Sequence, residues 1–530
     1  MIVKKKIQIE KIDILSKLVK DYSNYDSKFK PFINNFPKDY SDFSKTRTLS
    51  KDVRNDLVSV IRKQYKDTFF YKSNLNKVNK NISNLLLSNS QTVTTGHQLN
   101  VLASPLFLIY KVINTIVLAN KLSLKKNKNI IPIFWMASED HDFKEIQKCN
   151  IFKKSYIWKE NYKDIPVGCV SNKGIGDLLT EISLDVPDLP YKKELMDAFN
   201  NIYSKNKNYA NAHRALLTFL FSKYGLVILD ANNSVLKKHF IANFKSETSN
   251  QNVRQSIKET NDKLSVFYKP HLNPMKDNVF YFKGLLRQKI LIKNNSFILS
   301  DGSKKWSKKE LFIEIEKNPE RFSPNVILRA LYQEKILPNI AYIGGPSEIS
   351  YWIQLKKTFE MESIYFPVLL IRNLVLNLSE KEINVLKKYR IKDSDLFLAK
   401  DFVLNRYLKK NASINFDSEF QKLESISESI INKAKQVNSN LNLHVEIVLK
   451  KVIKDILKLE RKLINNQKDN HVIALRKINN LFQDLYFNGD IQERSASYIP
   501  YYMKFGSLFF DILIKNLDPL EKDYIILKGF

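Results

Sequence analysis

The sequence predicts an α/β fold, in which a Rossmann-like, doubly wound parallel sheet carries inserted connecting segments and a C-terminal α-helical coiled-coil arm. Three observations predict it. Short apolar runs alternate with longer amphipathic ones from Gln91 onward, a central stretch has strand-like runs joined by turn signals, and an apolar stripe runs from Ile430 to Leu463. The 530 residues are also too many for one typical hydrophobic core, so several substructures are expected.

The expected core is split between residues 85–240 and 324–377. In the first part, QTVTT and IIPIFWMAS are predicted strands on either side of a helix from Pro105 to Lys126, and GLVILD follows a further helix. In the second part, IAYIGG and FPVLLIRN follow helical segments in the same way. Strands that are apolar on both faces and flanked by helices indicate a parallel sheet covered on both sides.

The other segments flank or interrupt this core. We expect residues 1–84 to form an N-terminal helical segment and residues 489–530 to return to the core. The run VFYFKGLLRQKILIKNNSFILSDG, within 241–323, has Gly, Lys-Asn-Asn and Asp-Gly turn signals and predicts an inserted, mainly β connection.

Residues 378–488 predict the helical arm. Apolar residues recur at steps of three and four from Ile430 to Leu463, which indicates one continuous stripe on a long helix. No Gly or Pro interrupts residues 412–488, so the usual helix stops are missing. An extended helical hairpin or coiled coil follows, used either for self-association into a homodimer or for packing against its own chain.

The formal charge of +31, from 86 basic and 55 acidic residues, raises nucleic acid or an anionic membrane as partners. The lysines are spread through every segment beside many Asn and Ile, all of which have AT-rich codons, so base composition explains the bias as well as function does. A nucleic-acid surface would concentrate Arg and aromatic residues in one stripe. We therefore expect no specific nucleic-acid partner.

Cysteine usage and hydropathy point to the cytoplasm. Cys149 and Cys169 form no CxxC pair, and no His cluster has metal-ligand spacing, so we expect neither a disulfide scaffold nor a metal site. The N-terminus lacks an apolar signal region, and the most apolar stretch, Val101 to Ala119, is broken by Lys111 and Asn114. No export signal or membrane span is predicted.

The first candidate site is the turn after the strand QTVTT. Gly96, His97 and Gln98 precede a helix that starts near Pro105, and a Gly-containing loop at a helix N-terminus can receive a phosphate or carboxylate. A glycine that only permits a tight turn is the alternative.

The second candidate site is SEDHDF, directly after the apolar strand IIPIFWMA. Glu139, Asp140 and Asp142, with His141 among them, gather beside a buried strand end, where ligands of open α/β sheets bind. Such a cluster can hold an ammonium or sugar hydroxyls, and a solvated loop is the alternative.

The third candidate site follows IAYI, which ends in Gly344 and Gly345 before a helix. Glu348, Trp352 and Lys356 follow at four-residue steps and should share one face of that helix. Either this face meets a ligand, or Trp352 is core and the two charges are solvated. KKWSKK, at 304–309, is similar to the lysine-rich signature loop of class I aminoacyl-tRNA synthetases, but a capping box at Ser307 explains these residues more simply.

A family resemblance follows from these strings. TGHQLNVLASPLFLIYK, FWMASEDHDF, PERFSPNVILRALYQE, LPNIAYIGGPSEISYWIQLK and GDIQERSASYIPYYMKFG resemble, in order and over nearly the whole chain, the ligases that add cysteine in bacillithiol biosynthesis. The chain departs from the family at Ser104 and Ser347, where glycine is common, and at Ala330, where proline is usual. The resemblance implies a Rossmann core related to class I aminoacyl-tRNA synthetases and a coiled-coil domain that dimerises.

The resemblance also implies a reaction, in which cysteine is joined to the amine of glucosaminyl-malate after its carboxylate is activated, with ATP the expected co-substrate. Gly96, His97 and Gln98 would then meet the activated end, while Glu139, Asp140 and Asp142 would hold the cysteine ammonium or the sugar, with His141 an acid or base. The residues expected to complete the crevice are Arg329, Gln333, Gly344, Gly345, Glu348 and Lys356. The candidates for nucleotide binding are Arg372, Asn373, Gln492, Arg494, Tyr498 and Tyr501.

The sequence also allows two other functions. An aminoacyl-tRNA-synthetase-like RNA-binding protein would use the positive charge and the arm, although no true signature loop is present. A non-catalytic coiled-coil scaffold is the other. The sequence leaves the activation chemistry and the position of the nucleotide undecided.

Overall fold

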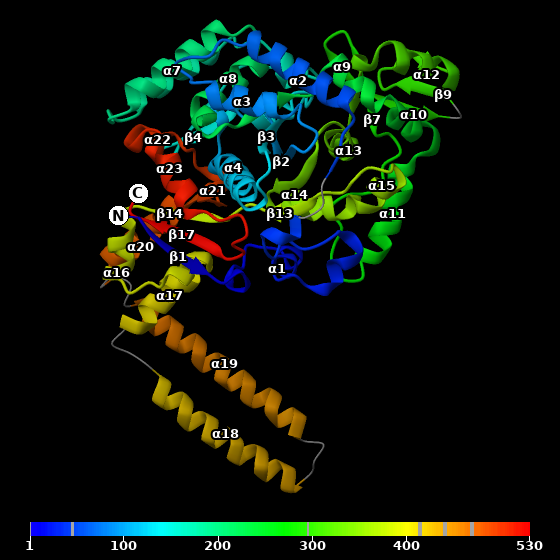
Figure 1. The fold of residues 1–530 in the computed structure, drawn as a ribbon. Helices are drawn as coiled ribbons and strands as arrows, with labels where there is room; N and C mark the ends of the chain where they lie inside the picture. The colour runs from blue at the N-terminus through cyan, green and yellow to red at the C-terminus, as the bar shows by residue number, and fades with distance from the viewer. Residues whose placement is uncertain (1, 44–46, 294–295, 412–415, 438–441, 467–470) are drawn as a thin grey trace.

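The computed structural model describes residues 2–43, 47–293, 296–411, 416–437, 442–466 and 471–530 (Figure 1). Its centre is a five-stranded sheet in the order β13-β12-β2-β3-β6, in which every neighbouring pair is parallel. The strands are β2 (Gln91–His97), β3 (Ile130–Met136), β6 (Val227–Asp230), β12 (Asn339–Gly344) and β13 (Val368–Ile371). The predicted doubly wound parallel sheet is therefore confirmed, including its split between two stretches of sequence.

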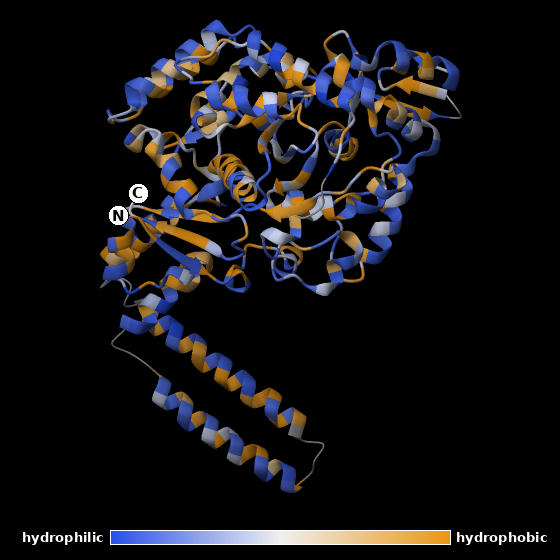
Figure 2. Ribbon diagram, in the orientation of Figure 1, coloured by the Kyte–Doolittle hydropathy of each residue, from blue (hydrophilic) through white to orange (hydrophobic). Residues whose placement is uncertain are grey.

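Both faces of this sheet are buried, because alternate side chains point to opposite sides. Phe134 and Met136 belong to one core cluster, together with helices α4 (Leu106–Lys126) and α8 (Tyr209–Phe221). Ile133 and Trp135 belong to another, together with α2 (Lys51–Lys66) and α13 (Val326–Ile336). Figure 2 shows α4 as a strongly hydrophobic helix beside the sheet. Among the described residues α4 alone is long and apolar enough to span a membrane, but 78% of its most apolar window is buried within the protein.

The inserted segment is helical before it is β. Helices α10 (Ile241–Asn250) and α11 (Asn252–Leu264) occupy its first half, so the expectation of a mainly β connection is wrong there. The second half forms an antiparallel sheet in the order β10-β9-β8-β7-β11, whose strands are β7 (Val279–Lys283), β8 (Leu286–Lys293), β9 (Ser296–Leu299), β10 (Lys305–Trp306) and β11 (Phe322–Pro324). The capping box at Ser307 is present and begins α12 (Lys308–Lys317).

The two chain ends meet in a small sheet that the sequence did not predict. β1 (Val3–Ile7) pairs antiparallel with β17 (Tyr524–Lys528), which pairs parallel with β14 (Val375–Leu378). The N and C labels accordingly lie side by side in Figure 1. The expected helices of the N-terminal segment are α1 (Lys17–Ser23), α2 and α3 (Asn76–Asn84), but its first residues are a strand because they find a partner at the far end of the chain.

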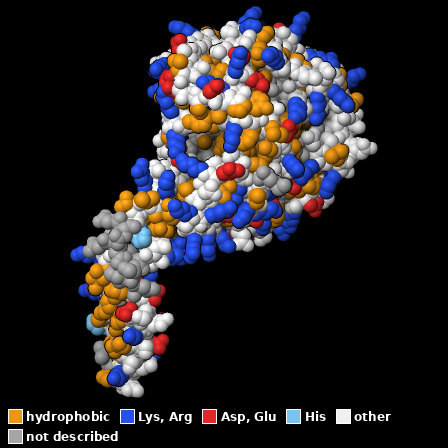
Figure 3. Space-filling view, turned by 90° about the vertical axis from the view of Figure 1, so that its left-hand side faces the viewer, with side chains coloured by type: hydrophobic (Ala, Val, Ile, Leu, Met, Phe, Trp, Pro, Cys, Tyr) orange, Lys and Arg blue, Asp and Glu red, His pale blue; other side chains and the backbone are white. Residues whose placement is uncertain are grey.

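The arm is a helical hairpin that projects from this small sheet (Figure 1). The predicted stripe does not lie on one helix, because α18 ends at Val437 and α19 runs from Asn442 to Asn466; residues 438–441 lie outside the described residues. Apolar side chains stay exposed on both helices, among them Ile426, Ile430, Ile447, Val448, Val452 and Leu459. Figure 3 shows hydrophobic side chains gathered in a row along one face of the arm.

Candidate active site

The strand order of the parallel sheet reverses between β12 and β2, because β3 and β6 follow on the β2 side and β13 follows on the β12 side. Ligands of open α/β sheets bind at such a point, so the edge where β2 and β12 end is the expected position for a ligand. Both strand ends are closely packed at their glycines. A Cβ on Gly344 would lie 2.9 Å from Ile349 Cδ1, and one on Gly96 would lie 3.2 Å from the carbonyl oxygen of Trp135. A Cβ on Gly345 would meet nothing within 4 Å, so only that glycine leaves open space above the strand end.

A buried ion pair joins the two loops at this edge. Lys111, on α4, is 2% exposed, and its Nζ donates to Glu348 Oε2 at 2.6 Å and to the carbonyl oxygen of Gly96. Glu348, on α14 (Pro346–Trp352), also accepts from the Tyr342 hydroxyl and from the backbone N–H of Gly345. Burial opposes ionisation of Glu348, but Lys111 outweighs it and holds the pKa of this carboxyl below its ordinary value. The pair therefore fixes the β2 and β12 loops relative to each other.

Arg329 adds a cation to the same edge. Its Nη1 donates to Gln333 Oε1 at 3.2 Å and would lie 3.6 Å from a Cβ on Gly96. Burial opposes its charge, but the neighbouring Tyr342 and the carboxylate of Glu348 outweigh it and raise the pKa of this guanidinium above its ordinary value. Within the described ranges no carboxylate forms an ion pair with Arg329, which leaves its charge available to an anionic ligand.

His97 lies between the basic edge and the acidic loop. Its Nδ1 is 3.1 Å from the carbonyl oxygen of Gln98, which can only accept, so Nδ1 carries the proton and Nε2 keeps its lone pair. Burial of the ring and the ammonium of Lys111 lower the pKa of His97 to about 4. The side chain is therefore a neutral imidazole with a free acceptor nitrogen at physiological pH.

Contacts with Lys237 and Gln98 hold the acidic loop after β3 in place. Glu139 forms an ion pair with the fully buried Lys237, and Asp140 Oδ2 accepts from Gln98 Nε2 at 2.7 Å. The same amide nitrogen donates to Glu145 at 2.7 Å, so Asp140 and Glu145 lie on either side of it. Asp142 is exposed and caps the short helix α5 (Phe143–Ile146).

His141 is bound by the inserted sheet. Arg287, on β8, donates from Nη1 to His141 Nδ1 at 3.0 Å and from Nη2 to the carbonyl oxygen of Pro324. His141 must then accept at Nδ1, so its neutral ring carries the proton on Nε2, the opposite tautomer to that of His97. Burial and the guanidinium of Arg287 lower the pKa of His141.

Lys356 lies apart from these groups. The helix α14 ends at Trp352, which stacks on Tyr342 with ring centroids 4.1 Å apart, and Lys356 Nζ donates to the carbonyl oxygen of Ile33. The structure thus brings together Gly96, His97, Arg329, Gln333 and Glu348, but not Lys356.

Most of the residues predicted to bind a nucleotide are engaged with other residues of the core and of the segment after the arm. Arg372 forms two hydrogen bonds of 2.8 Å with Glu493, and Gln492 bonds to the backbone of Asn377 in both directions. Asn373 bonds to Asn114. Tyr498 is buried, and Tyr501 stacks on Phe509 and contacts Phe530. These contacts fasten the segment after the arm to the core, and of the six side chains only that of Arg494 is largely exposed, at 55%.

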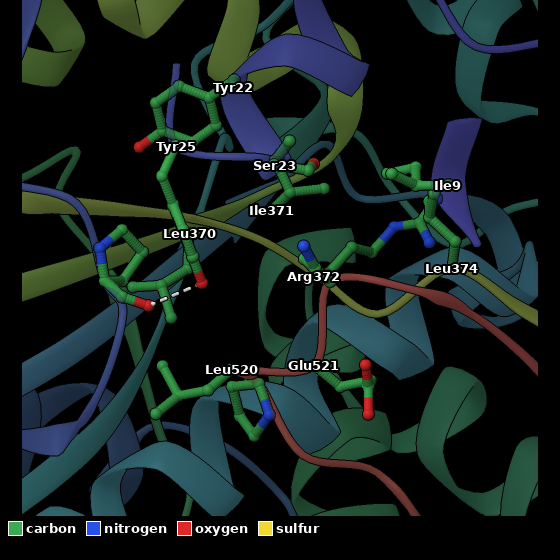
Figure 4. Close-up of a pocket in the computed structure, with 13 residues that line it drawn as sticks. Ile9, Tyr22, Ser23, Tyr25, Leu370, Ile371, Arg372, Leu374, Leu520 and Glu521 are labelled. Carbon is green, nitrogen blue, oxygen red and sulfur yellow. Dashed lines mark hydrogen bonds between the residues drawn. The ribbon is translucent and has the colours of Figure 1, made fainter. Parts of the chain in front are cut away.

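Two cavities border Arg372. The slot in Figure 4, between Tyr25, Arg372, Leu520 and Glu521, has about 40 Å³, which is room for about one water. The larger has about 370 Å³ and lies at the base of the arm, where Arg494 faces Ser347. Only the larger could admit a substrate.

Three cations of this site were missed as site residues: Lys111, Lys237 and Arg287. Lys111 left a signal, because a lysine in the middle of the apolar stretch Leu106 to Ala119 must be paired when that stretch is buried. Lys237 and Arg287 reach the acidic loop from segments distant in sequence, and nothing in their local sequence marks them. In the part of the chain that the structure describes, no group of three or more His, Cys, Asp or Glu side chains is arranged to hold a metal ion.

Comparison with known proteins gives the same family along the whole chain. Residues 2–373 match the family model for the bacillithiol biosynthesis BshC N-terminal Rossmann-like domain, and residues 375–529 match its C-terminal coiled-coil domain. Relatives named "Putative cysteine ligase BshC" include one from Flavobacterium johnsoniae, 34% identical over 97% of each chain, and one from Flavobacterium psychrophilum, 35% identical over 98% of this chain and 99% of the relative. One from Bacillus cereus is 28% identical over 82% of this chain and 84% of its own length. The resemblance seen in the sequence is thereby confirmed, and the chain belongs to the bacillithiol biosynthesis BshC family.

Proposed function

We propose that this protein is a ligase that joins L-cysteine to the amine of glucosaminyl-malate, the last step of bacillithiol biosynthesis. Its relatives are named as cysteine ligases, which supports formation of a carbon–nitrogen bond to cysteine. The observation that carries the proposal is the divided polarity of this edge of the sheet. Lys111 and Arg329 lie on its basic side, Asp140 and Glu145 on its acidic side, and His97 lies between.

The acidic side suits an ammonium group. Asp140 Oδ1 accepts two backbone N–H groups of its own loop and Oδ2 accepts from Gln98, while among the described residues the Glu145 carboxylate accepts only from Gln98. Two carboxylates that share one neutral donor keep most of their negative charge, so they attract the ammonium of cysteine or of the acceptor. Glu139, in contrast, is already neutralised by Lys237.

The basic side suits the activated carboxyl group. A carboxylate is a poor electrophile, and ATP would supply a better leaving group through an adenylate or an acyl phosphate. Arg329 would stabilise the negative charge that develops on the carbonyl oxygen and on the departing phosphate, while Lys111, already paired with Glu348, holds the strand ends in place.

His97 is the proposed base of amide formation. As the acceptor amine bonds to the carbonyl carbon, its nitrogen becomes strongly acidic, so a base of low pKa can remove the proton. The free Nε2 of His97 is the position that would receive it. His141 presents an N–H at Nε2 instead and would act as a donor.

ATP binding is proposed at the cavity beside Arg494. The guanidinium is exposed there and Ser347 contributes a hydroxyl, which suits phosphate recognition. Arg372 is already neutralised by Glu493, so in this proposal it positions the segment and does not contact the phosphates.

We further propose that the protein acts in the cytoplasm as a homodimer joined through α18 and α19, without a nucleic-acid or membrane partner. The exposed apolar row on the arm supports the dimer, because such a row on a projecting hairpin is unfavourable in water.

Mass spectrometry of low-molecular-weight thiols tests the proposed function. A deletion strain should lose bacillithiol and accumulate glucosaminyl-malate, and the wild-type gene should restore the thiol where His97→Gln does not. Normal thiol levels in the deletion strain would contradict the proposal.

A further inference from the structure

A second polar cavity adjoins the acidic loop, and none of the roles proposed above uses it. It has about 300 Å³ and lies among α2, α8 and the ends of β3 and β6. Ser138 and Asp230 contribute from the strand ends. Of the five side-chain amides in the lining, the nitrogens of Gln64 and Asn211 are bound to backbone carbonyl groups, which leaves the three of Asn208, Asn232 and Asn233. Its volume is at the lower end of the range of about 300 to 1,000 Å³ for small-molecule sites. We call it the amide cavity.

The three amides present donors to this cavity. Asn208 Oδ1 caps α8 at 2.9 Å, and Asn233 Oδ1 caps α9 (Ser234–Lys237) at 2.9 Å. Asn232 Oδ1 accepts from Lys237 Nζ at 2.8 Å. Each amide oxygen therefore has a hydrogen-bond partner, whereas each amide nitrogen donates to no group in the described part of the chain. The wall therefore holds amide N–H groups that a ligand can use.

Asp230 and Arg214 are two of the four charged residues of the wall, beside Lys63 and Asp67. Asp230 Oδ1 accepts from the Ser138 hydroxyl and from the backbone N–H of Asn232, while Oδ2 has no hydrogen-bond partner among the described residues. Arg214 is 1% exposed, and its Nε also lacks a partner there. Buried polar atoms without partners are uncommon in folded proteins and are usually satisfied by water or a ligand. The amide cavity thus offers both donors and an acceptor.

We propose that the amide cavity binds the hydroxyl groups of the acceptor sugar, an inference that rests on the proposed function. A hydroxyl both accepts from an amide N–H and donates to a carboxylate, so it matches Asn208, Asn233 and Asp230 together. No aromatic side chain is among the residues that line the cavity, so it lacks the flat wall on which a nucleotide base would stack. Glu139 directly follows Ser138, which places the acidic loop next to the ring that carries the amine.

The test removes the amide donors but keeps the helix caps. Serine caps a helix about as well as asparagine, so Asn208→Ser and Asn233→Ser should fold normally and lose only the N–H groups. Loss of one neutral hydrogen bond should raise KM for glucosaminyl-malate about five- to tenfold in each variant, with kcat and the KM values for cysteine and ATP little changed. Asn74→Ser is the matched control, because Asn74 is an exposed asparagine that accepts from the backbone N–H of Asn76 far from the cavity.

Calorimetry with the separate ligands decides between the outcomes. Unchanged affinity of the double variant for glucosaminyl-malate would overturn the inference, and so would weaker ATP binding with unchanged acceptor binding, which would assign the cavity to a ribose. If a serine variant does not fold, the matching Asn→Asp variant keeps the cap and also removes the donor. A wild-type protein that neither binds nor converts glucosaminyl-malate would instead refute the proposed function, and this inference with it.

Discussion

Lys111 Nζ lies 2.6 Å from Glu348 Oε2, and this contact joins the helix that follows β2 to the helix that follows β12. The contact spans the point between β2 and β12 at which the strand order of the parallel sheet reverses. The same ammonium donates to the carbonyl oxygen of Gly96, so the ion pair also fixes the strand end from which His97 extends. A single charge inside an apolar helix thereby positions the candidate base.

We predict that Lys111→Met destabilises the protein by about 3 kcal/mol, because it leaves the partly buried Glu348 carboxylate without its cation. Lys121→Met is the matched control on the same helix. Its partner Asp518 is 39% exposed, so its loss should cost about 1 kcal/mol or less. Thermal melting of both variants measures the difference, and equal melting temperatures would refute a structural role for the Lys111–Glu348 pair.

A second prediction concerns pH. The pKa of His97 is lowered to about 4 and that of the fully buried His213 to about 3, both mainly by burial. Between these values and the ordinary pKa of about 6.5 the unfolded chain binds more protons than the folded one. The stability that these residues contribute is therefore fully present above about pH 6.5 and is lost as the pH falls through that window.

Two measurements check this. Denaturant unfolding between pH 4 and 7 should show a smaller loss of stability in His213→Phe than in the wild type. The pH profile of kcat should show no inflection near 6.5 from His97, because that ring stays neutral down to about pH 4. An acid limb centred near 6.5 that disappears in His97→Gln would contradict the assigned pKa.

A third prediction concerns the arm. Val448 and Val452 are 46% and 42% exposed on α19, so replacing both with Lys should place charges in the packed seam of a dimer and dissociate it. Gln421→Lys with Asn432→Lys adds the same charge to exposed polar positions of α18 and should leave the dimer intact. Light scattering gives the mass of each. A wild-type monomer, or a dimer that survives in the valine variant, would exclude the arm as the contact.

Local patterns predicted the core well. Runs such as IIPIFWM carry enough apolar residues to be buried on both faces, so their alternation with helices predicts a parallel sheet covered on both sides. The pairing of β1 with β17 could not be predicted in this way. VKKKI has three lysines, and its partner lies at the opposite end of the chain.

Only the site residues at the ends of predicted strands could be predicted from the sequence. His97 and Asp140 follow buried strands and do lie at one edge of the sheet. Lys356 was assigned by helical spacing, and that spacing fails because α14 ends at Trp352. Arg287 reaches His141 from the inserted sheet, a contact that depends on how two substructures pack and that no local pattern encodes.

The last prediction separates the two aspartates of the acidic loop. Asp140→Asn places an amide against the Gln98 amide and removes half of the charge that Asp140 and Glu145 present to an ammonium. We expect turnover to fall about ten- to hundredfold, as for the loss of a charge-assisted hydrogen bond of about 1.5 to 3 kcal/mol. Asp142→Asn keeps the cap of α5 and changes an exposed side chain, so its activity and melting temperature should stay near those of the wild type. Each variant needs a melting curve beside its rate, since lost activity counts only at unchanged stability. Equal activity of Asp140→Asn and Asp142→Asn would show that Asp140 only supports the loop.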